Sequence, residues 1–317
     1  MLAFISRRMA AAAAMLLVIG TIIFSLLIIV PGDPAELLLS TGGGSATPEA
    51  IANLRANMGL DQPIMVQYAT FIFNTARLDF GTSIVDNGSI SSAIALRLPR
   101  TLEIIVVGAI LALLLAIPAG TAAGLRAGGK FDIAASAVNA LLTSVPGFVV
   151  GTLFIYFFAQ LLGWLPAGGY VALAANPVEH LQMLILPSLT VGLHLATIVF
   201  RMTRASVLEM RGHDWVRTAV AKGLRRKQVV RRHILYNALG PIITVVGLQL
   251  GILLGSTVLV EFVYNWPGLS GLLVSAVEQR DYPTVRAVIL TVAAIFIGIN
   301  MVIDILSSLL DPRIRLQ

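Results

Sequence analysis

The sequence predicts an all-α, polytopic membrane protein with six transmembrane helices and a small extracytoplasmic subdomain between the first and second helices. Of its 317 residues, 57% are hydrophobic and only 12% are charged, whereas a typical soluble domain carries roughly 25% charged residues. A soluble fold could not cover so much apolar surface with so few charges. In addition, uncharged runs recur at about the 20-residue length that a helix needs to cross a bilayer.

Six stretches are long and apolar enough to span a membrane. Residues 10–30 and 104–125 contain no charged residue over 21 and 22 positions. The uncharged run 133–178 is too long for one helix, and the glycines around Pro166 predict that a span near 134–160 is followed by a loop. The remaining spans are predicted at 181–200, 242–260 and 287–309, and kinks are predicted at Pro118, Pro146 and Pro187.

The N-terminal run is interpreted as an uncleaved span. Arg7 and Arg8 before an apolar stretch would suit a secretory signal peptide. However, the run is longer than a normal signal-peptide core, and no A-x-A cleavage site follows it. The sequence Pro31-Gly32-Asp33-Pro34 ends the run instead. Residues 1–30 are therefore predicted to form a cytosolic N-terminus and the first span.

The distribution of basic residues predicts the orientation, because cytoplasmic loops of membrane proteins carry an excess of Lys and Arg. With the N-terminus inside, 16 of the 22 basic residues lie on the cytosolic side and 6 on the outer side. The reverse topology would invert this bias. Both termini are therefore predicted to be cytosolic.

Two segments are predicted to lie outside the membrane. Residues 31–100 form the outer subdomain, in which Thr47 as N-cap and Pro48 at the first helical position predict a short helix. Residues 201–236 form a cytosolic loop with ten basic residues against Glu209 and Asp214.

The cytosolic loop has the pattern of a helix, a glycine turn and a second helix. Its apolar positions recur at helical spacing, and Gly223 offers a break among basic residues. One interpretation is a basic surface helix that rests on anionic headgroups. The other is a docking element whose apolar stripe enters a groove of a soluble partner. The stripe consists of Trp215, Val216, Ala219, Val220, Gly223 and Leu224.

At this loop the sequence resembles a known family. Arg217-Thr218-Ala219, then Gly223, then Arg232 to Leu239 with Pro241 is similar to the EAA loop of permease subunits in bacterial binding-protein-dependent ABC importers. Arg217-Thr218 stands where the general motif has Glu-Ala, a form common in the dipeptide/oligopeptide/nickel branch. Further agreement comes from Pro31 to Pro34, Met58 to Pro63 with Val66 to Tyr68, Asp79 to Ser83, Trp266 to Leu269, Arg280 to Pro283, and Leu310 to Arg315.

The resemblance implies a transport subunit, not an enzyme, in the bacterial cytoplasmic (inner) membrane. Residues 101–317 would be the permease core, including the coupling loop 201–236. Its partners would be a paralogous permease in a heterodimer, one or two ATP-binding subunits that hydrolyse ATP, an extracytoplasmic solute-binding protein and membrane lipid, with no nucleic acid. The residues expected to couple to the ATPase are Trp215, Arg217, Thr218, Ala219, Lys222, Gly223 and Leu224.

The solute implied by the resemblance is a small peptide, either a dipeptide or an oligopeptide. The same importer type for nickel or another metal chelate, or for glutathione, is the alternative. Outside this class, an ATP-independent channel or a membrane anchor with a basic loop fits the composition. Co-purification with an ATPase separates these classes.

Gly247, Gly251 and Gly255 form a ladder of small residues in the fifth span. Such spacing lets helix backbones approach closely. One interpretation of the ladder is packing within the chain. For the fifth span, the resemblance favours a pathway-lining or subunit-facing role.

The sequence contains no convincing catalytic, cofactor or metal site. Gly124 to Lys130 matches G-x-x-x-x-G-K, but Phe131 stands where a phosphate-binding loop needs Ser or Thr. His194 lies inside a span, where a hydrogen bond to a neighbouring helix is favoured over a metal. His180 is placed on an outer loop, and Glu103 is expected to reach headgroups or a basic residue. No catalytic residue, cofactor or metal ligand is predicted.

Overall fold

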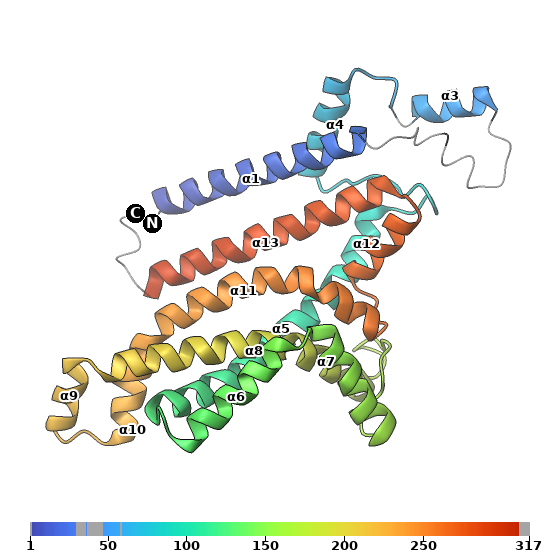
Figure 1. The fold of residues 1–317 in the computed structure, drawn as a ribbon. Coiled ribbons are helices and arrows are strands. Elements are labelled where there is room, and N and C mark those ends of the chain that lie inside the picture. The colour runs from blue at the N-terminus through green and yellow to red at the C-terminus, as the bar shows by residue number, and fades with distance from the viewer. Residues whose placement is uncertain (1, 30–35, 37–46, 58, 311–317) are drawn as a thin grey trace. The chain divides into compact units, whose positions relative to one another are not determined.

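A computed structural model describes residues 2–29, 36, 47–57 and 59–310 (Figure 1). The chain divides into two compact units. Of the described residues, one unit comprises Pro99–Gly271 with those of 1–5 and 296–317, and the other comprises those of Ser6–Leu98 with Leu272–Ile295. The described part is helical and contains no named strand, with one isolated β-bridge between Thr82 and Ser89. The predicted all-α membrane fold is therefore confirmed.

Five helices are each long and apolar enough to cross a membrane, and a bent pair makes a sixth span if it is counted as one. The prediction of six spans corresponds to this upper count. The spans lie in α1 (Leu2–Ile29), α5 (Ile90–Leu125), α8 (Pro177–Arg211), α11 (Tyr236–Val263, whose span begins at Arg226) and α13 (Tyr282–Leu310).

The bent pair joins α6 (Lys130–Ser144) to α7 (Gly147–Phe154) and the π-helical η1 (Ile155–Leu161), with a bend of 102°. Pro146 sits at the bend, and Val145 before it is extended at φ −98° and ψ 126°. A proline disfavours the helical conformation of the residue before it and has no N–H to continue the ladder. The kink predicted at Pro146 is confirmed as a complete break, whereas Pro118 and Pro187 lie inside the continuous helices α5 and α8.

In two places the structure corrects the sequence prediction. Helix α5 begins at Ile90 and continues through Pro99, so this helix, predicted to begin near residue 104, starts within the segment assigned to the outer subdomain. His180 lies in the first turn of α8 and is buried, not on an outer loop. The proposed motifs at Pro31 to Pro34 and Asp311 to Arg315, together with Met58, lie outside the described residues.

The unit built on Ser6–Leu98 contains most of α1, α3 (Pro48–Asn57), α4 (Ile64–Ala76), the start of α5, most of α12 (Leu269–Glu278) and the first part of α13. The amide of Ala50 donates to the hydroxyl of Thr47 over 3.3 Å, which confirms Thr47 as the cap of α3. The rings of Phe24 on α1 and Phe71 on α4 stack at 5.6 Å. The Ser83 hydroxyl donates to Asp281 over 2.6 Å and ties the loop before α5 to the start of α13.

The core of the other unit is α8, which packs against α11, α7 and α6. Glycines on α5 allow this helix to lie close to α8 as well. A Cβ added at Gly120 would lie 2.8 Å from the backbone oxygen of Phe200, and one at Gly124 would lie 2.9 Å from that of Arg204. Glycine is therefore required at both positions, because a larger residue would push the helices apart.

Candidate functional site

The predicted helix–turn–helix is present in the loop 201–236. Helix α9 (Asp214–Ala221) follows α8 after Gly212 and His213, and leads to α10 (Arg226–Gln228) and the π-helical η2 (Val229–Leu235). Gly223 has φ +76°, the left-handed conformation that glycine adopts without strain. The amides of Gly223 and Leu224 donate to the carbonyls of Val220 and Ala219, so the turn closes the end of α9.

The apolar stripe of α9 has a buried centre and exposed edges. Val216 and Ala219 are only 5% and 4% exposed, and α9 packs against η2, where Val229 and Ile234 are also buried. Trp215, Val220 and Leu224 remain 46%, 60% and 38% exposed. The chain therefore anchors the helix by its central residues and leaves three large apolar side chains available. Ala219, expected to couple to the ATPase, faces inward.

Polar groups complete this surface, which is called the docking surface after the role predicted from the sequence: Trp215, Arg217, Thr218, Val220, Lys222 and Leu224. The His213 ring stacks on Trp215 at 3.9 Å. Arg217 lies 3.7 Å from Asp214, but both side chains are exposed, so this pair adds little stability. Thr218 donates to the backbone of Asp214. Apolar edges beside exposed basic groups suit an acidic groove with an apolar floor.

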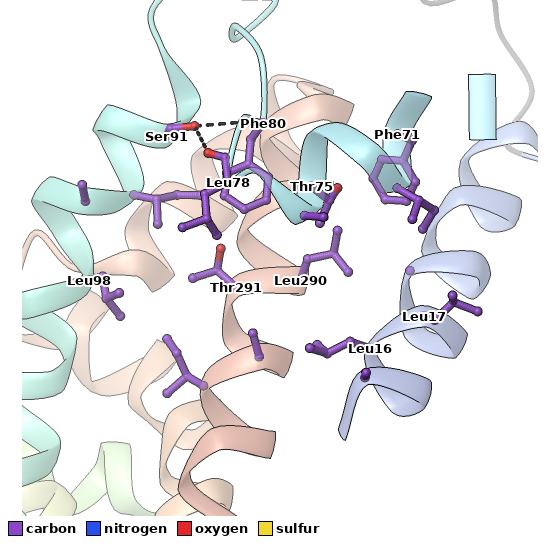
Figure 2. Close-up of a pocket in the computed structure, with 18 residues that line it drawn as sticks. Leu16, Leu17, Phe71, Thr75, Leu78, Phe80, Ser91, Leu98, Leu290 and Thr291 are labelled. Carbon is purple, nitrogen blue, oxygen red and sulfur yellow. Dashed lines mark hydrogen bonds between the residues drawn. The ribbon is translucent and has the colours of Figure 1, made fainter. Parts of the chain in front are cut away.

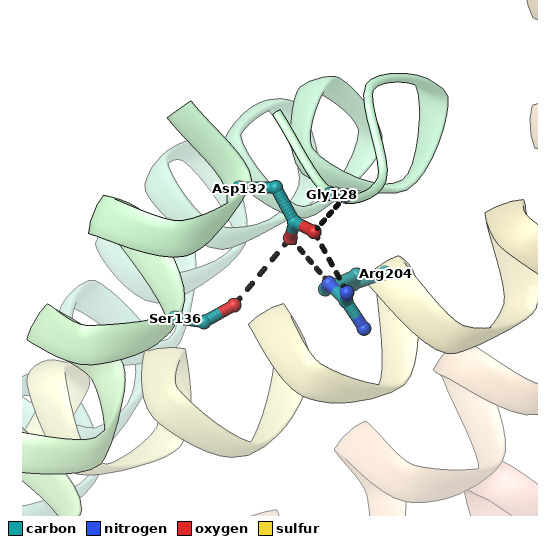
Figure 3. Close-up of polar contacts among 4 residues, drawn as sticks. All are labelled: Gly128, Asp132, Ser136 and Arg204. Atoms are coloured by element: carbon teal, nitrogen blue, oxygen red, sulfur yellow. Dashed lines mark hydrogen bonds and ion pairs between the residues drawn. The ribbon is translucent and has the colours of Figure 1, made fainter. Parts of the chain in front are cut away.

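An ion pair links α8, the helix that leads to the docking surface, to α6. Figure 3 shows Arg204 of α8 against Asp132 of α6, with Nη2 donating to Oδ2 over 2.8 Å. Asp132 also accepts from the amide of Gly128 over 2.9 Å and from the Ser136 hydroxyl. In addition, Arg211 at the end of α8 donates to the carbonyl of Leu125 at the end of α5. The end of α8 is thus fastened to both α5 and α6.

The contacts of Asp132 also bear on the phosphate-loop match at Gly124 to Lys130. This stretch forms the turn between α5 and α6, and Gly128 has φ +81°. Its amide, which a phosphate would need, is already bonded to the carboxylate of Asp132. The glycines therefore serve a tight interhelical turn.

A polar cavity of about 520 Å³ lies between α6 and α8. Six of its eight lining residues carry a hydroxyl, amide or guanidinium group, although it lies between two apolar spans. Such a cavity can hold water or a polar solute, because the lining offers hydrogen bonds that hydrocarbon does not. The polar lining residues are Ser136, Asn139, Thr143, Ser144, Arg201 and Arg204.

At the opposite end of α5, a buried carboxylate holds the segment from Trp266 to Leu269 in place. Glu261 accepts from the Thr101 hydroxyl and, over 2.9 Å, from the amide of Ser270. Thr101 in turn accepts from the amide of Leu269 over 2.8 Å. A Cβ on Gly268 would collide with the Glu261 carboxylate, which explains the glycine. This network holds the turn after α11 against α5.

Glu103 and His180 form a second contact at this end. The Nε2 of His180 and the Oε1 of Glu103 are 2.6 Å apart, and Nδ1 lies 2.7 Å from the carbonyl of Val171. The expectation that Glu103 reaches a basic residue is confirmed. His194, in contrast, is exposed, so its expected hydrogen bond to a neighbouring helix is not formed.

The three glycines of the ladder on α11 have different surroundings. A Cβ at Gly247 would lie 2.4 Å from Ile303, and one at Gly251 would lie 2.4 Å from Phe296, so both glycines face α13. Gly255 has no neighbouring atom within 4 Å of such a Cβ and is exposed. Within the described residues, no group of three or more His, Asp or Glu side chains is arranged to hold a metal.

Comparisons with known proteins agree over almost the whole chain. Residues 116–316 match the family described as binding-protein-dependent transport system inner membrane component, and residues 1–105 match its N-terminal counterpart. A probable peptide ABC transporter permease protein of Sinorhizobium fredii is 36% identical over 285 residues. The glutathione transport system permease protein GsiC is 40% identical in Salmonella typhimurium and 39% in Escherichia coli. Each of these alignments covers 90% of both chains.

The fold is also similar to that of a solved transporter. A chain of the methionine ABC transporter MetNI, in an inward-facing conformation, superposes with a TM-score of 0.58 at 17% identity. The match covers 69% of this chain and 96% of that one. A second crystal form gives a TM-score of 0.53 at 18% identity. At this identity the likeness establishes the fold.

Proposed function

The chain belongs to the family of binding-protein-dependent transport system inner membrane components, and we propose that it conducts small peptides as one permease subunit of an ABC importer. It is a multi-pass inner membrane protein and a transport subunit. The apolar spans provide the membrane domain. The observation that carries the proposal is the docking surface, in which three large apolar side chains are exposed on a helix that the chain anchors by Val216 and Ala219.

The solute we propose is a small peptide, a dipeptide or an oligopeptide, with glutathione as the alternative. The relatives described above are a probable peptide permease and a glutathione permease, and glutathione is itself a tripeptide. Their similar identity to this chain favours the class of small peptides without separating its members. The metal-chelate alternative gains no support from these relatives.

We infer that the docking surface binds an ATP-binding subunit, in which ATP is hydrolysed. When two such subunits close, they would move α9, and α9 would move the end of α8. The bonds from Arg204 to Asp132 and from Arg211 to Leu125 would carry this movement to α6 and α5. Because α6 and α8 line the cavity of about 520 Å³ between them, the same movement would change access to that cavity. This sequence of contacts supports coupling between ATP hydrolysis and transport.

The remaining partners follow from the proposed orientation. With both termini in the cytosol, the docking surface faces the ATP-binding subunits, and residues 47–89 face an extracytoplasmic solute-binding protein. A paralogous permease would complete the pathway. The exposed side of α11 around Gly255 is the surface that we assign to this second permease.

A crosslinking experiment tests the docking surface. The chain has no cysteine, so a single Val220→Cys substitution can carry a bifunctional reagent with a maleimide and a photoreactive group. We expect crosslinks to the ATP-binding subunit in the assembled importer, with a yield that changes when ATP is trapped. Leu114→Cys, an exposed position within the span of α5, is the control and should label lipid. Labelling of lipid alone from position 220 would refute the proposal.

A second experiment tests the solute. Membrane vesicles that contain the complete importer and its solute-binding protein should take up a labelled dipeptide or glutathione when ATP is inside. Titration calorimetry on the solute-binding protein should show binding of the same solute. Uptake of nickel chelates with no uptake of peptides would overturn the peptide assignment but would leave the docking surface untouched.

A further inference from the structure

Two adjoining cavities lie in the unit built on Ser6–Leu98, one almost wholly apolar and the other, called the polar cavity below, of mixed lining with charged and amide side chains. The first, about 800 Å³, is almost wholly apolar and lies among α1, α4, the start of α5 and the first part of α13 (Figure 2). The second, about 700 Å³, contains Gln67, Asn74, Asp79 and Arg286 in its lining. The two share Phe71, Thr75 and Phe80 as lining residues. They therefore adjoin across one short wall.

The two cavities follow each other along the helix axes. On α13, Arg286 lines the polar cavity, and Leu290 and Ile295 line the apolar one. At 1.5 Å per residue, the apolar cavity extends about 13 Å beyond Arg286 toward the middle of the span. On α1, Phe24 near its end lines the polar cavity, while Ala13 lines the apolar one. Both helices thus place the polar cavity at the membrane surface and the apolar one in the hydrocarbon.

Arg286 brings a partly buried positive charge to the polar cavity. Its guanidinium lies 5.0 Å from the centre of the Phe71 ring, and among the described residues no carboxylate or hydrogen-bond acceptor pairs with it. A cation in such a place attracts an anion strongly, because little water screens it. Asp79, whose carboxylate accepts from the amide of Gly81 over 3.0 Å, adds one negative charge to the same cavity.

We propose that these cavities bind one zwitterionic phospholipid with an ethanolamine headgroup. The phosphate binds Arg286, the ammonium group binds Asp79, and an acyl chain fills the apolar cavity. An anionic phospholipid fits less well, because its headgroup leaves Asp79 unpaired. A soluble zwitterion such as a free dipeptide could satisfy both charges, but it would leave the apolar cavity empty.

The surroundings favour a lipid as the occupant. In the most apolar stretch of α1, and likewise in that of α13, only 17% of the residues are buried inside the chain. Both helices therefore have wide surfaces that require an apolar medium. The Ser91 hydroxyl donates to the carbonyl of Leu78 and accepts the amide of Phe80 (Figure 2). These bonds satisfy the backbone of the loop above the cavity, so the wall that faces the acyl chain presents carbon.

The test uses the assembled importer in nanodiscs that contain trace photoreactive phospholipids, with a diazirine in the acyl chain. The probes are phosphatidylethanolamine and phosphatidylglycerol with the same chains. Mass spectrometry should find labels from the ethanolamine lipid concentrated several-fold on Leu16, Leu17 and Leu290 relative to Leu114 and Leu115 of α5. The glycerol lipid should label the cavity residues several-fold less.

Matched variants separate the site from the general lipid belt. Ala13 and Ala14 are neighbouring exposed residues of α1, and only Ala13 lines the cavity. Ala13→Phe should therefore lower cavity labelling several-fold, while Ala14→Phe should not. Arg286→Gln should lower it and remove the preference for ethanolamine, whereas Arg280→Gln, at an exposed arginine before α13, should change neither.

Three results would overturn the proposal. The first is labelling of the cavity residues no stronger than that of the α5 belt. The second is equal or stronger labelling by phosphatidylglycerol. The third is loss of labelling when a free dipeptide is added in excess, which would assign the polar cavity to the soluble zwitterion. None of these results depends on which solute the importer carries.

Discussion

Arg204 and Asp132 are 72 residues apart in sequence, and their side chains meet through two parallel hydrogen bonds between α8 and α6 (Figure 3). A guanidinium and a carboxylate in this geometry form one of the stronger polar contacts in proteins. Asp132 is buried and accepts two further bonds, so its charge is fully compensated. The pair is thus a rigid joint between the helix that leads to the docking surface and the bent pair of helices.

Asp132→Asn should weaken this joint. The amide keeps the shape of the side chain but removes the charge, and hydrogen bonds to charged groups contribute about 1.5–3 kcal/mol each. We expect lower thermal stability of the purified importer and uptake reduced more strongly than ATP hydrolysis. Parallel assays of uptake and ATPase activity in vesicles measure this difference.

The exchange Asp132→Arg with Arg204→Asp tests whether the joint itself matters. If the ion pair is the cause, the exchange should recover part of the uptake that each single substitution loses, although Gly128 and Ser136 lose their acceptor. Arg201→Gln, on the same helix and exposed, serves as the control for stability. Equal loss of uptake and ATP hydrolysis in Asp132→Asn would contradict a transmitting role.

Gly223→Val should uncouple the importer without preventing membrane insertion. Valine at φ +76° is strained, because a left-handed conformation costs an L-residue about 1–2 kcal/mol and a β-branched residue more. The turn would open, and Leu224 would leave the docking surface. We expect normal amounts of protein in the membrane, with uptake and solute-stimulated ATP hydrolysis both lost.

Gly163→Val provides the comparison for Gly223→Val. Gly163 also has a positive φ, +62°, and a Cβ there meets no atom within 4 Å, but it lies in the loop after η1. Valine is similarly strained at both positions, but Gly163 lies outside the docking surface. If both substitutions abolish uptake, backbone strain alone explains the loss and the docking role of Gly223 fails.

The sequence predicts the local features of this chain and misses most of the long-range ones. The all-α class, the glycine turn at Gly223 and the break at Pro146 follow from composition and local chemistry, which a sequence carries directly. The Asp132–Arg204 pair does not, because nothing local indicates which helices become neighbours. The local signal for this pair is Asp132, a charged residue in the first turn of an apolar helix, but it does not indicate the partner. The sequence places His180 on a loop because the predicted span begins at residue 181, whereas α8 begins at Pro177.

The docking surface shows the same limit at the scale of one helix. Periodicity identifies the stripe from Trp215 to Leu224 but treats its members as equal. The structure separates them, because η2 packs on Val216 and Ala219 and leaves Trp215 and Val220 exposed. Periodicity indicates that a helix has an apolar face, whereas only the tertiary contacts decide which part of that face is already used.

Thr101→Val should loosen the turn that follows α11. The Thr101 hydroxyl donates to Glu261 and accepts from the amide of Leu269, and valine can do neither. An unsatisfied buried polar group costs about 1–3 kcal/mol. We expect a lower unfolding temperature for Thr101→Val and near-complete recovery in Thr101→Ser, which keeps the hydroxyl. If the two variants unfold at the same temperature, the hydroxyl does not hold the turn.

The last prediction distinguishes two glycines one helical turn apart. Gly251→Leu should destabilise the chain by about 1–3 kcal/mol, because the new side chain collides with Phe296 of α13 and a packed core resists added volume. Gly255→Leu should leave the stability of the chain almost unchanged, since no atom lies near a Cβ at that position. Thermal unfolding of the two variants in the same detergent measures the difference.

The same two variants also test what covers the exposed side of α11. Gly255 lies among large exposed residues at helical spacing, Leu248, Ile252, Leu259 and Phe262. If a second permease packs there, a leucine at 255 prevents the close approach that the glycine permits. We therefore expect Gly255→Leu to lower the amount of second permease recovered with the chain, although the chain itself stays folded. Full recovery of the partner would mean that this side of α11 faces lipid.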